Sequence, residues 1–197
     1  MKKFIACVIS LLMYQQAYAL EKMDERFLVH YGKSSAPLKV TEYMSFSCPH
    51  CVKIFQDFPK IKQEFIDTGL LYFTFQPVPK DLTTIRALHC LEMLSEKEKP
   101  LFLEALFEYL EETEDAQKLC QAMLDFLACF SKEKIPLDDL AYLKQTPLME
   151  KAFLFLSQEN QVKALPTVEI NGVLFSSELP SYTFFAEAVQ AVMGEGK

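Results

Sequence analysis

The stretch "EYMSFSCPHCVKIF", residues 42–55, joins two different sequence patterns at a pair of cysteines. Ahead of the pair, "PLKVTEYMSF" (residues 37–46) mixes β-branched and aromatic residues, which predicts a strand. From Pro49 apolar residues recur at helical intervals until Gly69, which predicts a helix. The following "LLYFTFQPVP" (residues 70–79) is an apolar strand pattern that ends at prolines. Strand, helix and strand of this length predict a βαβ unit with a parallel pair of strands.

The middle of the chain, residues 81–161, shows only helical patterns. They lie in "TTIRALHCLEML", "KPLFLEALFEYLEE", "DAQKLCQAMLDFLACF", "PLDDLAYL" and "TPLMEKAFLFLSQEN", with Pro100, Pro136 and Pro147 expected in first helical turns. Beyond them, "TVEI" and "VLF" flank Asn171-Gly172, the signal of a type I′ hairpin, and a last amphipathic helix follows Pro180. The order βαβ, helices, ββα predicts one α/β domain with a helical insertion.

The N-terminal segment "MKKFIACVISLLMYQQAYA", residues 1–19, begins with two lysines, continues with an apolar stretch and ends in Ala17-Tyr18-Ala19. This layout predicts a cleavable secretory signal peptide, and the apolar stretch is too short to span a bilayer. An amphipathic first helix is the alternative. The formal net charge of −7, without a basic cluster, argues against nucleic acid and anionic membrane surfaces as partners.

The Cys48-Pro49-His50-Cys51 motif has the spacing of a redox centre. A strand that runs into it places Cys48 at a helix N-terminus, where backbone N–H groups and the helix dipole favour a reactive thiolate. Cys51 follows one turn later, close enough to form a disulfide. Pro49 suits the first helical turn, and a protonated His50 would stabilise the reduced form, which makes the disulfide more oxidising.

Two other interpretations of the motif are a metal site and a pair of inert buried thiols. A zinc site needs four protein ligands, or three and a water, and the only other closely spaced pair, His89-Cys90, is adjacent rather than spaced. Pro-His is a poor core sequence for two inert thiols. We therefore expect no metal and no cofactor other than the Cys48–Cys51 disulfide itself.

The other cysteines matter because disulfides form outside the cytosol. Without Cys7 of the signal segment, five cysteines remain, so at least one lies outside any internal bridge. Cys120 and Cys129 lie nine positions apart in one predicted helix, about 13 Å. A disulfide needs Cα atoms within about 7 Å, so these two should not bridge. We expect Cys90 and Cys120 to pack as small apolar side chains; any structural bridge would join Cys90 to Cys120 or Cys129.

Taken together, "SFSCPHC" after a strand, the helical insertion and "LPTVEINGVLF" before the last helix resemble the DsbA-like thiol:disulfide oxidoreductases of the thioredoxin superfamily. The resemblance covers residues 27–195. It implies a thioredoxin-like domain formed by residues 20–80 and 162–197, with residues 81–161 as the all-helical insertion. It also implies that Cys48 is the exposed nucleophile and Cys51 the resolving cysteine.

Further residues follow from the same resemblance. Pro166 matches a cis-proline that faces the cysteine pair, with Leu165 and Thr167 beside it in contact with substrate. Leu165 departs from the valine or threonine expected there, which leaves substrate range and redox poise open. Glu42, six positions before Cys48, matches a buried acidic residue that could shuttle the proton of Cys51. The alternative for Glu42 is a strand-end side chain that reaches solvent.

The strand pattern also bears on Glu42, because side chains alternate between the two faces of a strand. This alternation predicts that Glu42, Met44 and Phe46 share one face.

The function that the resemblance implies is that of a periplasmic oxidant, which donates the Cys48–Cys51 disulfide to folding exported proteins with free thiols. It would be reoxidised by a quinone-linked, DsbB-like membrane partner. One alternative is a periplasmic reductase that runs the same site in reverse. Another, of a different class, is a non-catalytic peptide- or metal-binding module on a thioredoxin fold.

Overall fold

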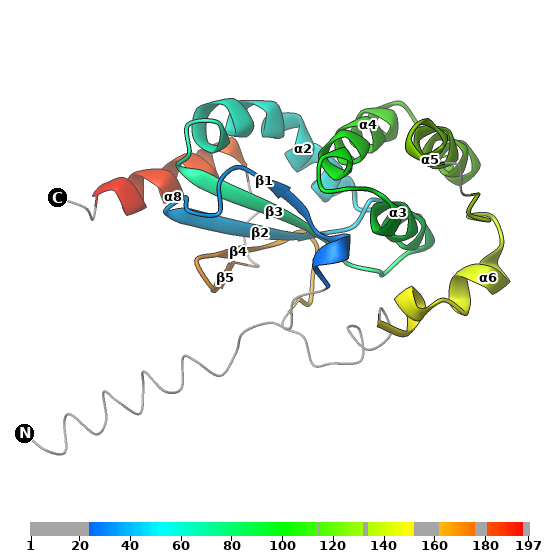
Figure 1. Cartoon of the computed structure of the whole chain (residues 1–197). Helices are drawn as coiled ribbons and strands as arrows, with labels where there is room; N and C mark the ends of the chain where they lie inside the picture. Colours follow the sequence, from blue (N-terminus) through cyan, green and yellow to red (C-terminus); the bar gives the residue numbers. More distant parts are fainter. Residues whose placement is uncertain (1–23, 114, 132–133, 152–161, 176–180, 195–197) are drawn as a thin grey trace, which may run out of the picture.

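The computed structural model of the chain describes residues 24–113, 115–131, 134–151, 162–175 and 181–194. Its strands form one five-stranded sheet in the order β1-β3-β2-β4-β5 (Figure 1). They are β1 (Val29–Tyr31), β2 (Leu38–Met44), β3 (Leu71–Pro77), β4 (Thr167–Ile170) and β5 (Val173–Phe175). Strands β2 and β3 run parallel, and all other neighbours run antiparallel. The predicted parallel pair and the C-terminal hairpin are thus confirmed.

The helices divide between the sheet and a separate helical group. They are η1 (Glu25–Phe27), α2 (Pro49–Ile61), its π-helical continuation η2 (Lys62–Ile66), α3 (Leu82–Met93), α4 (Glu98–Glu112), α5 (Ala116–Phe130), α6 (Leu140–Lys144) and α8 (Tyr182–Gly194). Helix α8 lies beside α2, whereas α3, α4 and α5 gather beyond the end of the sheet (Figure 1). This is the predicted thioredoxin fold with inserted helices. Within the described ranges, no helix is both long and apolar enough to cross a bilayer.

The turns that end α2 and join β4 to β5 follow the local sequence. Gly69 has a φ of +80° after the helix, and Asn171 and Gly172 have φ values of +47° and +86°. Positive φ at both central residues is the signature of a type I′ turn, as predicted. Asn171 also accepts a hydrogen bond from the backbone N–H of Lys39 at 2.8 Å, which ties the hairpin to β2.

One of the three proline predictions is wrong. Pro100 lies in the first turn of α4, and Pro147 begins a helical stretch that continues to Lys151. Pro136, however, lies outside any helix, in the segment before α6. Helix α6 begins later because Asp139 is its N-cap. The Asp139 side chain accepts hydrogen bonds from the backbone N–H groups of Ala141 and Tyr142.

Aromatic side chains hold the first helix on the sheet. Phe58 of α2 packs edge-on against Phe73 and Phe75 of β3, with ring centroids 5.4 and 5.0 Å apart, and Phe185 of α8 meets Phe73 on the same face. Such pairs contribute about 0.5–1.5 kcal/mol each beyond their buried area. Phe55, one turn earlier in α2, also contacts Phe75, so two successive turns of the helix pack on β3.

The cysteines of the helical group lie where the sequence predicted. Helix α5 is continuous from Ala116 to Phe130, with Cys120 buried and Cys129 exposed. Cys90 is fully buried, and both Cys90 and Cys120 belong to the main apolar core. Their packing as small apolar side chains is confirmed, and all three are free thiols in the structure.

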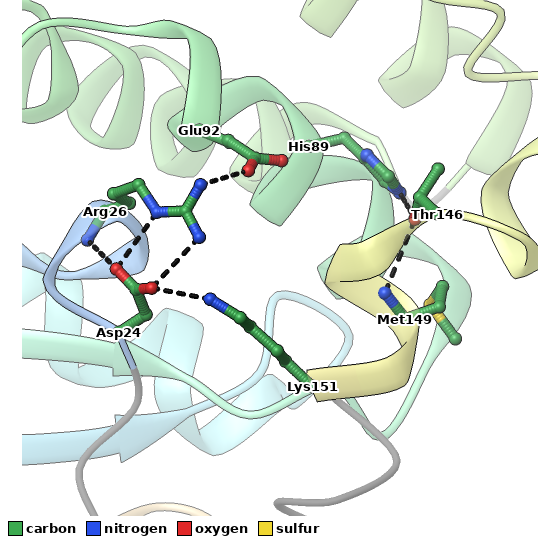
Figure 2. A network of polar contacts seen from close by, with 7 residues as sticks. All are labelled: Asp24, Arg26, His89, Glu92, Thr146, Met149 and Lys151. Atoms are coloured by element: carbon green, nitrogen blue, oxygen red, sulfur yellow. Dashed lines mark hydrogen bonds and ion pairs between the residues drawn. The ribbon is translucent and has the colours of Figure 1, made fainter.

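A polar network ties residues 24 and 26, around η1, to Glu92 of α3 and to Lys151 (Figure 2). Asp24 accepts hydrogen bonds from the Arg26 side chain at 3.0 and 3.1 Å and from Lys151 Nζ at 2.8 Å. Arg26 in turn donates to Glu92 of α3 at 2.7 Å. These partners hold the pKa of Asp24 well below its usual range, chiefly through the Arg26 hydrogen bonds.

His89 makes the stability of the helical group depend on pH. It is 5% exposed on α3, and its Nε2 lies 3.4 Å from Thr146 Oγ1 (Figure 2). Burial lowers the pKa of His89. Below about pH 6.5 the unfolded chain therefore binds a proton that the folded chain resists, and stability falls on acidification.

We expect the H89Q variant to lose less stability than the wild type between pH 7.5 and pH 5.5, because a glutamine amide can take the place of the imidazole Nε2 beside Thr146 without titrating. Urea unfolding of both proteins at the two pH values measures this. Equal losses in the two proteins would contradict the assignment to His89.

Candidate active site

The cysteine pair lies at the N-terminus of α2, as predicted. Cys48 is the N-cap residue, with φ −93° and ψ 111°, and Pro49 follows at the first helical position. The Cys48 carbonyl accepts hydrogen bonds from the N–H groups of Cys51 and Val52 at 3.0 and 3.1 Å, which closes the first turn. Cys48 is partly exposed and Cys51 is buried, and both are free thiols. Of these two sulfurs, only that of Cys48 is therefore open to attack by another protein.

Pro49 and His50 lie between the two sulfurs and are both exposed. The His50 side chain is therefore accessible to solvent between the two cysteines.

The segment before β4 faces the exposed cysteine. The Leu165–Pro166 peptide bond is cis, and the Cys48 thiol donates to the Leu165 carbonyl oxygen, with Sγ 3.6 Å away. The predicted cis bond and its place against Cys48 are confirmed. Thr167 opens β4 with its side chain buried, donating from Oγ1 to the Ala164 carbonyl at 2.8 Å. Its hydroxyl thus stabilises this turn, whereas Leu165 is partly exposed beside Cys48.

Glu42 lies beneath the pair, not in solvent. The side chain is 1% exposed, and neither carboxyl oxygen has a hydrogen-bond partner among the described residues. Burial raises the pKa of Glu42 to about 8. Glu42 lies opposite Phe75 and Val168, and Met44 follows it two positions later in β2, so these two share a face as predicted. Phe46 lies beyond the end of β2, where strand alternation no longer applies, and joins the same apolar core as Met44 and Cys51.

Glu42 and Cys51 also influence each other's ionisation. The pKa of the Cys51 thiol is raised first by burial, then by the negative charge of Glu42 and by the hydrogen bond with Cys48, while a backbone hydrogen bond with Ser45 opposes this. The site therefore combines an exposed sulfur with a buried one that resists ionisation. The carboxyl group of Glu42 lies close enough to the buried sulfur for its charge to raise the pKa of that thiol, although no hydrogen bond joins the two groups.

A polar cluster next to the pair was missed in the sequence. Asp81, the N-cap residue of α3, accepts hydrogen bonds from the hydroxyl groups of Ser45, Ser47 and Thr84 at 2.5, 2.8 and 2.8 Å. Ser47 directly precedes Cys48. The available signal was the aspartate ahead of a helical pattern, which is typical of an N-cap. Within the described residues, no three His, Cys, Asp or Glu side chains gather as metal ligands.

An exposed and a buried thiol at the N-terminus of the first helix of a thioredoxin fold, opposite a cis-proline, define a thiol:disulfide oxidoreductase. The sequence model of the family described as Thioredoxin matches residues 26–191. The chain belongs to this family.

Related proteins have names that agree with this class. The chain is 29% identical over 164 residues to a protein of Bacillus cereus named "Probable disulfide bond formation protein D", covering 76% of this chain and 73% of the relative. A shorter match of 46 residues, 46% identical, joins it to "Disulfide bond formation protein D" of Bacillus subtilis.

Solved structures share the fold. Oxidised BdbD from Bacillus subtilis superposes with a TM-score of 0.62 at 23% identity, covering 88% of this chain and 96% of the other. Wolbachia pipientis α-DsbA1 gives 0.63 at 22% identity, covering 89% and 95%. Chlamydia trachomatis DsbA gives 0.63 at 19% identity, covering 91% and 96%. Each of these likenesses covers at least 88% of this chain, so the chain shares their overall fold.

Proposed function

We propose that the protein is an exported oxidant that donates the Cys48–Cys51 disulfide to folding proteins with free thiols. The observation that carries this proposal is the position of Cys48, partly exposed at the N-terminus of α2. A helix N-terminus stabilises a thiolate, which exists only in the reduced form, and so makes the disulfide a better oxidant. The two Bacillus relatives are named as disulfide bond formation proteins, which supports the oxidising direction of the reaction.

The proposed reaction has two exchange steps. In the first, a substrate thiolate attacks Cys48 Sγ, the Cys48–Cys51 bond breaks, and Cys51 leaves as a thiolate that must take up a proton. In the second, another substrate thiolate attacks the substrate sulfur of the mixed disulfide and releases Cys48 as a thiolate. The substrate loses two electrons and gains a disulfide, and the cysteine pair gains those two electrons.

Glu42 is the proposed proton donor for the first step. With a pKa of about 8, Glu42 is mostly protonated at neutral pH. The departing Cys51 thiolate is disfavoured by burial, which raises the pKa of this thiol. Transfer of the proton from the carboxyl group to the sulfur removes that charge from the core. When the disulfide forms again, the Cys51 thiol can return this proton to the Glu42 carboxylate.

The location and the reoxidant are further parts of the proposal. The signal peptide predicted for residues 1–19 lies outside the described residues. Export to the periplasm would place the protein where disulfides persist. A DsbB-like membrane partner with a quinone would then accept the two electrons from the dithiol. Leu165 and Thr167 flank the cis-proline beside Cys48, and Leu165 is the side chain expected to meet substrate.

The reduction potential separates the oxidant from a reductase with the same site. We expect equilibration with glutathione to give a value well above the roughly −270 mV of thioredoxin. A value near that of thioredoxin would favour the reductase. If the pair fails to exchange with glutathione while the protein takes up zinc in the reduced state, a non-catalytic module is favoured.

His50 gives a more specific test of the oxidising character. Replacing it with leucine removes the side chain between the two cysteines that can carry a positive charge, and leaves Pro49 in place. We expect the potential to fall by about 30 mV or more, because each 30 mV corresponds to about 1.4 kcal/mol for a two-electron couple. The H30L variant, on β1, is the matched control and should leave the potential unchanged. An unchanged potential in H50L would remove His50 from the explanation.

A further inference from the structure

Asp81 gathers the polar groups of the loop that carries Cys48. Its Oδ1 accepts from the Ser47 hydroxyl and from the Thr84 backbone N–H, both at 2.8 Å. Its Oδ2 accepts from the Ser45 hydroxyl at 2.5 Å and from the Thr84 hydroxyl at 2.8 Å. One carboxylate thus caps α3 and binds two of the three residues that precede Cys48.

The same loop has a second link to α3. The backbone N–H of Phe46 donates to Thr84 Oγ1 at 3.0 Å, and Thr84 and Phe46 are 0% and 1% exposed. The Ser45 carbonyl accepts from the backbone N–H of Cys48 at 3.2 Å. The loop between β2 and α2 is therefore fixed to the first turn of α3, and an internal hydrogen bond closes its turn at Cys48.

Asp81 also places a negative charge next to the redox site. No Lys, Arg or His side chain forms an ion pair with it in the described part of the chain. Its partners are hydroxyl groups and the N-terminus of α3, whose partial positive charge it offsets. A thiolate at Cys48 therefore experiences the favourable end of α2 together with an unfavourable carboxylate.

We propose that Asp81 is a positioning residue that sets the redox poise of the Cys48–Cys51 pair: it fixes the loop before Cys48, and its charge keeps the reduced form less stable than the α2 N-terminus alone would make it. This inference rests on the proposed role of Cys48 as the reactive thiol. Because the disulfide form carries no charge at Cys48, the charge of Asp81 changes the energy of the reduced form only, whereas its hydrogen bonds hold the loop in both forms.

Two substitutions in the full-length protein separate charge from structure. D81N removes the charge but keeps an N-cap, since asparagine caps helices as well as aspartate. S47A keeps the charge but removes one of the hydroxyl groups that compensate it. The two variants should shift the Cys48 thiolate in opposite directions, whereas a merely loosened loop would shift both in the same direction. D115N is the matched control, because Asp115 caps α5 in the same way outside the active-site loop.

The measurement is the pH dependence of Cys48 alkylation by iodoacetamide in the reduced protein, read from the Cys48 peptide by mass spectrometry. We expect D81N to lower the midpoint of this profile by about half a pH unit, an effect typical of one charge at moderate distance. The reduction potential should rise by about 15 mV, which is this shift converted for a two-electron couple. S47A should raise the midpoint, and D115N should leave it unchanged.

An unchanged or raised midpoint in D81N, or shifts of the same sign in D81N and S47A, would overturn the role of Asp81. This failure is distinct from failure of the proposed function. If wild-type Cys48 reacts like an ordinary free thiol and exchanges no disulfide, the oxidant proposal fails. If wild-type Cys48 is activated but insensitive to Asp81, only the present inference fails.

Discussion

The C48S variant is expected to lose disulfide transfer to a reduced substrate protein by at least about a thousandfold, because serine cannot form the mixed disulfide. Cys48 is the only sulfur of the pair open to solvent, since Cys51 is 1% exposed. Oxidative refolding of a reduced, unfolded substrate measures the loss.

C51A should behave differently from C48S. It cannot form the Cys48–Cys51 disulfide, so it should also fail to oxidise a reduced substrate. When it is mixed with a disulfide-containing substrate, its Cys48 thiolate attacks that disulfide and one substrate thiolate leaves; without Cys51 to displace the bound substrate, the mixed disulfide should accumulate and be visible on non-reducing gels. The matched control is C129S, which removes an exposed cysteine on α5 and should retain full transfer. Full activity in C48S, or loss of activity in C129S, would contradict the assignment of the reactive thiol.

The E42Q variant is expected to stabilise the folded protein at neutral pH while slowing its chemistry. The pKa of Glu42 is raised to about 8 from an ordinary value of 4.5. The free energy of unfolding is thus highest below about pH 4.5 and falls as the pH rises toward 8. In this range the carboxyl group is ionised in the unfolded chain but still protonated in the folded protein. At pH 7 the substitution should recover on the order of 2–3 kcal/mol.

The pH dependence makes this prediction specific. Urea unfolding at pH 5, 7 and 8 should show the advantage of E42Q over the wild type growing with pH, whereas E108Q, on the exposed surface of α4, should show no such trend. Glutamine cannot supply a proton to Cys51, so formation of the mixed disulfide should slow by at least about tenfold. An advantage that does not change with pH would mean that the Glu42 carboxyl group is not held protonated in the core.

The parts of the site that lie close together in sequence could be predicted from it. Cys48 to Cys51 form one helical turn, and the Asn171-Gly172 turn needs only its own two residues. Pro166 and Glu42 came from resemblance to a family, and their positions agree with the structure. Local pattern was therefore enough to predict geometry that one helix or one turn determines, and family resemblance was enough to predict Pro166 and Glu42.

Other features depend on contacts that no local pattern reveals. Strand β1 has three residues and forms only because it can pair with β3, Val29 opposite Phe75. The cluster around Asp81 joins residues 34 and 36 positions apart, so its serines look like ordinary loop residues in the sequence. Pro136 was misplaced because Asp139, three residues later, is the stronger helix start.

The pairing of β2 with β4 has a consequence for the order in which the protein matures. Tyr43 lies opposite Thr167, so the central strand receives its second neighbour from residues 124 positions later. A chain that emerges N-terminus first exposes Cys48 and Cys51 long before β4 and the Leu165 carbonyl are available. During that interval Glu42 has no complete core around it, and the two thiols are those of an unfinished chain. We expect truncations that end before residue 165 to have cysteines of ordinary reactivity. The newly made protein is therefore a client for disulfide chemistry before it becomes a catalyst of it.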